Sequence, residues 1–218
     1  MRALDERARA VGLTVRGMLA GPVEGAPEGT RTLVLLGPDE PSFWPRFTAS
    51  TEYRDGAPHA LDRWSRRVIA DLAEAEDGLA LFPFDGPPYA PFVSWALQSG
   101  QAWPSPVGPL VHEHAGLFIS YRGAIALSRD LDRPAPGAPT CPSCHQPCAT
   151  ACPVVGALSD RAPYDAARCL EHIATDAGTP CRTEGCLVRR ACPTAAMFRR
   201  LPEQSAFHMQ AFQEAHRA

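Results

Sequence analysis

The residues most able to do chemistry in this chain are its cysteines, which all lie between Cys141 and Cys192. They form two runs, and each run ends in Cys-Pro: Cys141, Cys144, Cys148 and Cys152, then Cys169, Cys181, Cys186 and Cys192. Closely spaced cysteines on a loop can supply several thiolates to one small inorganic cluster, because the loop wraps it and points backbone N–H groups at the sulfurs. The proline that follows each run is compatible with the first turn of a helix. The pattern therefore indicates metal or cluster ligation.

The doubled pattern resembles that of two-cluster bacterial ferredoxins, in which the last cysteine of each run ligates the other cluster. This resemblance implies two 4Fe-4S clusters. The first would be held by Cys141, Cys144, Cys148 and Cys192, and the second by Cys152, Cys169, Cys181 and Cys186. The spacing departs from the ferredoxin pattern in two ways. One residue is extra between Cys144 and Cys148, and Arg189 stands where a third closely spaced cysteine is expected, so Cys181 would take that role.

Three other states of these thiols stay open at this stage. Two zinc ions, each with four thiolate ligands, would accept the same residues, although zinc ribbons usually show two CxxC pairs. Disulfides would require an oxidising compartment, and the N-terminal stretch MRALDERARAVGL is charged and amphipathic, unlike a secretory signal. Unliganded thiols are the third state. Metal analysis separates all of these from an iron–sulfur protein.

Composition limits the function classes further. A chain of 218 residues allows one large domain or two small ones, and a net charge of −3 without a basic block argues against nucleic-acid binding. The sequence contains no lysine, which excludes Schiff-base and P-loop lysine chemistry. No apolar run approaches the length of a membrane span. We therefore expect a cytoplasmic protein with no membrane partner.

The apolar patterns predict an α+β domain over residues 1–131, a linker over 132–140 and a cysteine module with a C-terminal helix over 141–218. The linker reads DRPAPGAPT and has no core residue. Helices are expected at 3–11, 60–76, 91–99, 166–174, after Pro193, and at the C-terminus through Phe207, Ala211, Phe212 and Ala215. Strands are expected at 32–36, 79–82 and 116–128, the last with a bulge at Gly123.

Two further residues before the linker are candidates for cofactor binding. His112 and His114 would share one face of a strand, where His112 could contact a cofactor or merely begin the strand. Arg122 lies in an otherwise apolar segment, and a buried arginine needs an anionic partner. That partner could be a bound phosphate or carboxylate, or a protein acid such as Glu113.

The cysteine module also resembles the C-terminal iron–sulfur part of epoxyqueuosine reductases, through the two Cys-Pro runs and the Asp-Ala-x-x-Cys stretch at 165–169. The segments TLVLLGPDEPSFWPRF and VHEHAGLFISYRGAIAL resemble the cobalamin-processing CblC family, with His112, Gly116, Arg122 and Gly123 as the matching positions. The resemblance implies a nitroreductase/CblC-like α+β domain that binds cobalamin or FMN, and it leaves a tRNA link open. No position matches the catalytic aspartate of epoxyqueuosine reductases, and this chain is much shorter.

These observations predict an iron–sulfur electron-transfer protein, ferredoxin-like in its second half, that passes single electrons to a redox partner protein. An oxidoreductase related to epoxyqueuosine or cobalamin reductases is the alternative, with the clusters feeding electrons to a corrinoid or flavin in the first domain. A zinc-stabilised structural or interaction protein is the third possibility.

Overall fold

The computed structural model describes residues 1–198 and 200–216, and it divides the chain into two compact units. The first unit consists of Met1–Ala102 and Ser120–Gly137, and the second of Trp103–Ile119 and Ala138–Ala218. The last boundary falls inside the predicted linker 132–140, which has no helix or strand. Residues 103–119, which the sequence placed in the N-terminal domain, belong instead to the unit that carries the cysteines. Arg199, Arg217 and Ala218 of the predicted module lie outside the described residues.

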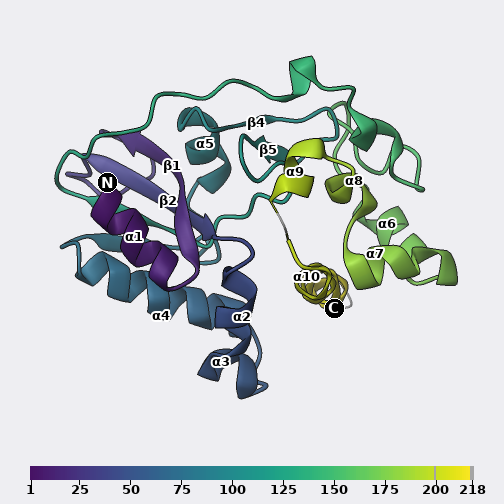
Figure 1. Ribbon diagram of the computed structural model, residues 1–218, viewed down its shortest axis with the longest axis horizontal. Helices are drawn as coiled ribbons and strands as arrows, with labels where there is room; N and C mark the ends of the chain where they lie inside the picture. The colour runs from purple at the N-terminus through teal and green to yellow at the C-terminus, as the bar shows by residue number, and fades with distance from the viewer. Residues whose placement is uncertain (199, 217–218) are drawn as a thin grey trace. The chain divides into compact units, whose positions relative to one another are not determined.

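A four-stranded antiparallel sheet forms the centre of the first unit (Figure 1). Its strands are β1 (Leu13–Ala20), β2 (Thr32–Pro38), β3 (Leu79–Leu81) and β6 (Gly123–Leu127), in the order β1-β2-β6-β3. Every pairing is antiparallel, so this mixed fold is of the α+β class, as predicted, and not a parallel α/β layer.

Helical segments cover both faces of β2, which explains why all seven of its residues are buried. The direction of the side chains follows from the alternation along the strands. A Cβ on Gly123 would lie 2.7 Å from Ile69 of α4 (Ala60–Glu74), which places α4 on that face. Gly17 lies on the opposite face of the sheet. A Cβ added to it would lie 2.9 Å from Ser99, which directly follows α5 (Phe92–Gln98). The apolar run of β2 is therefore the core of a layered unit.

The remaining helices of this unit are α1 (Arg2–Ala10), α2 (Phe43–Thr48) and α3 (Thr51–Arg54). Helix α1 packs against β1 and buries Leu4 and Ala8. The rings of Phe43 and Phe47 stack with centroids 5.9 Å apart, and the edge of Trp64 meets both. These aromatic side chains fill the core around α2 and α4.

The helices expected at 3–11, 60–76 and 91–99 and the strands at 32–36 and 79–82 are confirmed to within a few residues. The strand expected over 116–128 is wrong in its first half, because only Gly123–Leu127 is extended. Gly116 adopts a φ of +53° and closes a turn with His112, and the backbone N–H groups of Phe118 and Ile119 bond back to Ala115 and Gly116. The break therefore lies at Gly116 and not at Gly123. Strand β1 was not predicted.

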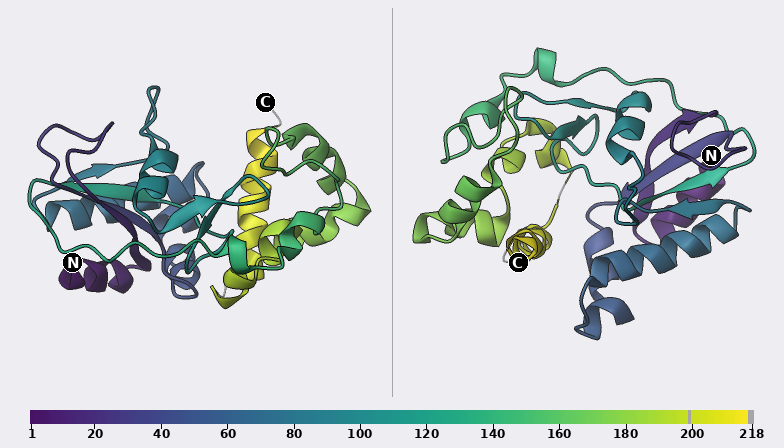
Figure 2. Two further views of the ribbon diagram at one scale, coloured as in Figure 1. Left: turned by 90° about the horizontal axis from the view of Figure 1, so that it is seen from above. Right: turned by 180° about the vertical axis from the view of Figure 1, so that it is seen from behind.

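The second unit is built from short elements (Figure 2). Strand β5 (Leu110–His112) pairs with β4 (Ala102–Pro104), whose last two residues begin this unit. The helical elements are η1 (Cys141–Ser143), η2 (Pro147–Thr150), α6 (Ala166–Ile173), η3 (Asp176–Gly178), α7 (Thr179–Glu184), α8 (Leu187–Arg190), α9 (Pro193–Met197) and α10 (Pro202–Ala215). The helices expected near 166–174, after Pro193 and at the C-terminus are confirmed as α6, α9 and α10. Helix α10 packs along α7.

None of the helices in the described part of the chain combines the length and the apolar character that a membrane span requires.

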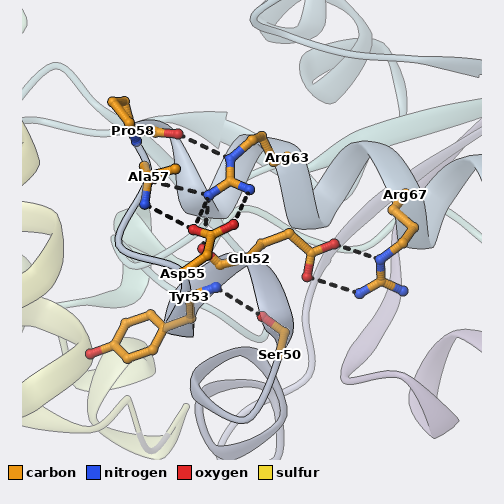
Figure 3. Close-up of polar contacts among 8 residues, drawn as sticks. All are labelled: Ser50, Glu52, Tyr53, Asp55, Ala57, Pro58, Arg63 and Arg67. Atoms are coloured by element: carbon orange, nitrogen blue, oxygen red, sulfur yellow. Dashed lines mark hydrogen bonds and ion pairs between the residues drawn. The ribbon is translucent and has the colours of Figure 1, made fainter.

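Two arginines of α4 hold the short helix α3 against it (Figure 3). Arg67 forms a two-pronged contact with the carboxylate of Glu52, with N–O distances of 2.5 and 3.1 Å. Arg63 binds both oxygens of Asp55 at 2.7 and 2.8 Å. The hydrogen bonds from Arg67 lower the pKa of Glu52 from 4.5 to about 2. The Glu52–Arg67 pair therefore stabilises the fold through the ionised carboxylate.

We expect Glu52→Gln to lower the free energy of unfolding by about 1 kcal/mol at pH 7, since Arg67 is half exposed and water screens the pair. The folded-state pKa lies below the ordinary value, so the stabilisation is complete above pH 4.5 and is lost as the pH falls towards 2. Urea unfolding of both proteins should thus converge at the acid end. Glu74→Gln, at an exposed position of α4, is the matched control. An undiminished difference at pH 2 would contradict this account.

Candidate metal centre

Four cysteines from both runs line one cavity in the second unit. They are Cys141, Cys144, Cys148 and Cys192, the set that the ferredoxin pattern predicts for the first cluster. The other lining residues are Ser105, Val111, Leu117, Thr140, Gln146, Pro193 and Thr194. The space between them, with the solvent at its mouth, is about 330 Å³.

Short helical turns place these four thiols. Cys141 begins η1, Cys148 lies in η2, and Cys192 is the N-cap of α9, where Pro193 occupies the first helical position. Element η2 packs against α8, which leads directly to Cys192, so the last cysteine of the second run meets the third of the first. Between Cys144 and Cys148, Gln146 adopts a φ of +52°. The backbone N–H of Gln146 donates to Cys144 Sγ at 3.3 Å.

A close backbone contact joins the two walls of this cavity. Val111 and Leu117 stand on either side of the turn at Gly116, while Pro193 and Thr194 begin α9. A Cβ on Gly116 would lie 2.4 Å from the backbone nitrogen of Ala195, a distance that no side chain tolerates. The glycine is therefore required twice, for its left-handed φ and for the approach of α9.

The remaining cysteines form a second set whose members interact electrostatically with one another. They are Cys152, Cys169, Cys181 and Cys186. Burial raises the pKa of Cys169, and the neighbouring Cys186, Cys152 and Cys181 raise it further. Burial raises the pKa of Cys181 too, and Cys186 and Cys152 add to that effect. Burial also raises the pKa values of Cys141 and Cys148, and Cys192 and Cys144 raise both of them further. The eight thiols thus separate into the two crosswise sets.

Local structure positions the second set. Asp165 caps α6 by accepting the backbone N–H of Arg168 at 3.1 Å, which fixes the helix that carries Cys169. Helix α6 packs against α7, which carries Cys181, and Cys186 is the N-cap of α8. Backbone N–H groups of Val154 and Leu187 donate to Cys152 and Cys181, and the hydroxyl of Tyr164 donates to Cys169. Donors of this kind stabilise negative charge on sulfur.

The chemistry of the donors fits a cluster with thiolate ligands. All eight cysteines are free thiols, so the disulfide alternative does not describe this structure. Burial raises the pKa values of five of these thiols, so metal binding to them must release protons, as is usual for thiolate ligands. They are Cys141, Cys148, Cys152, Cys169 and Cys181. No group of three or more histidine, cysteine or acidic side chains among the described residues is arranged to hold one metal ion.

His112 lies in the same unit as the cysteines and is 2 % exposed. Its Nδ1 accepts hydrogen bonds from the backbone N–H groups of His114 and Ala115, at 3.1 and 3.3 Å. This nitrogen therefore stabilises the turn that ends at Gly116. His114 is largely exposed and contacts Glu113 at 3.4 Å. His112 therefore has the structural role that was one of its two predicted alternatives. The cavity is lined by Val111 and not by His112.

Arg122 belongs to the first unit, whereas all eight cysteines belong to the second. Its Nη2 contacts Asp62 at 2.5 Å, and its Nε donates to the Ser65 hydroxyl at 3.0 Å. Burial lowers the pKa of Arg122, and Asp62 opposes that shift. The partner is therefore an acid of α4 and not Glu113, which sequence reasoning had offered. The guanidinium is held by the protein itself.

Sequence reasoning missed the residues that surround the thiols, including Val111, Leu117, Gln146 and Tyr164. The Cys-rich spacing predicts ligands but not the walls around them, which come from a segment about 30 residues earlier in the chain. Only the Gly in HEHAG, before an apolar stretch, signalled a required turn there.

Comparison of this chain with protein-family models, with curated proteins and with solved structures finds no match.

We expect Gly116→Ala to destabilise the second unit by about 3 kcal/mol or more, because it adds backbone strain and a clash with α9. Gly156→Ala is the matched control, since Gly156 has a φ of +81° but nothing within 4 Å of an added Cβ. The control should lose only about 1 kcal/mol, the cost of the left-handed backbone. Thermal unfolding of both variants measures the difference. Equal losses would show that the contact between Gly116 and Ala195 is unimportant.

Proposed function

We propose that this protein is an iron–sulfur electron-transfer protein whose second unit holds two 4Fe-4S clusters. The observation that carries the proposal is the crosswise grouping of the thiols. Cys192 lines a cavity with Cys141, Cys144 and Cys148. Cys152 instead interacts electrostatically with cysteines of the second run, namely Cys169, Cys181 and Cys186. A grouping by sequence neighbours would instead have put Cys152 with the other cysteines of its own run. The exchange of the last cysteine is the feature of two-cluster ferredoxins.

The role of the chain in this function is to provide thiolates, shield them and set their electrostatics. A bound 4Fe-4S cluster accepts and releases one electron with little change of shape. Val111 and Leu117 form an apolar wall at the first set. Backbone N–H donors to Cys144, Cys152 and Cys181 offset part of the negative charge that the thiolates bring together.

The finer fold assignment is part of the same proposal. A ferredoxin-like second unit is supported by the two Cys-Pro runs, each of which has its proline near a helical start or turn. A nitroreductase/CblC-like first unit is supported by its α+β class and by helices on both faces of the antiparallel sheet. We assign the protein to the cytoplasm on the same terms, because reduced thiols and cluster assembly suit that compartment.

The crosswise sets give a sharp test through single serine variants of anaerobically prepared protein. The wild type should be brown and contain about eight iron and eight sulfide per chain. Cys148→Ser and Cys192→Ser should impair the same cluster, although these residues are far apart in sequence. Cys152→Ser and Cys186→Ser should impair the other. Electron paramagnetic resonance spectra of the reduced variants therefore fall into these two pairs. Ser143→Ala, exposed beside Cys144, is the control and should match the wild type.

Two results would contradict the proposal. A colourless protein with stoichiometric zinc would favour the structural alternative. If instead Cys148→Ser and Cys152→Ser left the same residual spectrum, each run would serve a single cluster and the crosswise arrangement would be wrong.

A further inference from the structure

The two cysteine sets differ in the charge of their surroundings. The cavity of the first set is lined by its four cysteines and by side chains that are all apolar or uncharged, among them Val111, Leu117 and Thr194. No arginine contributes to that lining, nor does any acid. The lining of this cavity is thus neutral.

Arg168 gives the second set a positive neighbour. It directly precedes Cys169 on α6, and its Nη1 donates to the backbone oxygen of Val155 at 3.2 Å. Val155 follows Cys152 by three residues, so the guanidinium bridges the segments of two ligands of this set. No carboxylate of the described residues forms an ion pair with Arg168, and Asp165 is occupied as the cap of α6. The positive charge is therefore not neutralised by a salt bridge.

Two arginines of α8 add to this charge. Arg190 pairs with Glu184 at 2.5 Å and is largely compensated. Arg189 forms no ion pair within the described part of the chain, and its charge acts on Tyr164, whose hydroxyl binds the sulfur of Cys169. Arg182, which directly follows Cys181, donates only to the backbone oxygens of Ile173 and Thr175 and to the hydroxyl of Thr179. Arg168, Arg182 and Arg189 thus lie close in sequence to ligands of the second set and form no ion pair within the described residues.

Hydrogen bonds do not account for a difference between the sets. The first set has the backbone N–H of Gln146 on Cys144 and the hydroxyl of Thr140 on Cys141. The second has backbone donors on Cys152 and Cys181 and the hydroxyl of Tyr164 on Cys169. Both sets therefore have one hydroxyl and at least one backbone donor, and the arginines are the larger contrast.

We propose that Arg168, supported by Arg189, makes the second cysteine set the stronger electron acceptor of the two. The inference rests on the proposed function, because it concerns clusters held by both sets. Reduction adds one negative charge at the site, and a nearby uncompensated cation stabilises that charge even though Arg168 is exposed and water screens part of the attraction. A one-electron reductant such as dithionite loses one electron to the protein, no bond breaks and no proton is needed. The first electron is then retained beside Arg168 and not in the neutral cavity.

Redox titration of the anaerobic protein, followed by electron paramagnetic resonance, tests this inference. The wild type should show two one-electron steps. Arg168→Gln should shift only the step of higher potential, and should shift it downward by about tenfold in electron affinity, which is 59 mV for a one-electron couple. Arg189→Gln should act in the same direction. Arg168→Lys keeps the charge and should restore most of the affinity, which a loss of packing alone would not do. Arg161→Gln, exposed in the same unit, is the control for total charge.

The outcomes separate this inference from the function on which it rests. Clusters that are present but insensitive to Arg168→Gln, or a shift of the lower step, would overturn the inference and leave the iron–sulfur function standing. About four iron per chain would overturn both this inference and the two-cluster proposal, because only one set would then hold a cluster. A protein without iron would overturn both.

Discussion

The mutual repulsion of closely packed buried thiolates is the constraint on which the second unit depends. Burial opposes the ionisation of Cys148 and Cys181, and each neighbouring thiolate opposes it again. Such a group is tolerable as neutral thiols, or as thiolates around a positive centre. Under the proposed function, a bound metal centre would offset a charge that the protein alone would not carry. This repulsion explains why hydrogen-bond donors contact the thiols and why arginines lie near one of the two sets.

The exchange of cysteines between the runs also gives the second unit its connectivity. Its helices are short, and elements such as α8 and α9 would not be stable alone. The first run reaches the second through the contact of η2 with α8, and the turn at Gly116 reaches α9 through backbone atoms. Metal binding at crosswise sites would therefore join segments that are distant in sequence. In small modules of this kind, ligand binding and folding are coupled.

Much of the local structure could be predicted from the sequence, but its tertiary contacts could not. Helix α4 has apolar residues at helical spacing and β2 has a continuous apolar run, so each element shows its own pattern. Strand β1 was missed because the pairing register shifts between Val15 and Gly17, and that irregularity interrupts the alternation. The strand expected at 116–128 failed because the apolar residues 117–119 pack beside a turn that Gly116 makes.

The candidate ligands could also be predicted from the sequence, because cysteine spacing is a local signal. The cavity wall from Val111 and Leu117 could not, because these residues lie across a linker from the cysteines and carry no chemical signature. The partner of Arg122 also depends on a tertiary contact, because Asp62 lies 60 residues earlier, in the first turn of α4. The division of the chain at 102/103 and 119/120 depends on these contacts and not on composition.

Anomalous diffraction at the iron absorption edge, from crystals grown without oxygen, tests the central claim most directly. The account predicts two separate iron centres, one enclosed by Cys141, Cys144, Cys148 and Cys192 and the other by Cys152, Cys169, Cys181 and Cys186. A single centre, or two centres that each take their ligands from one run alone, would contradict it.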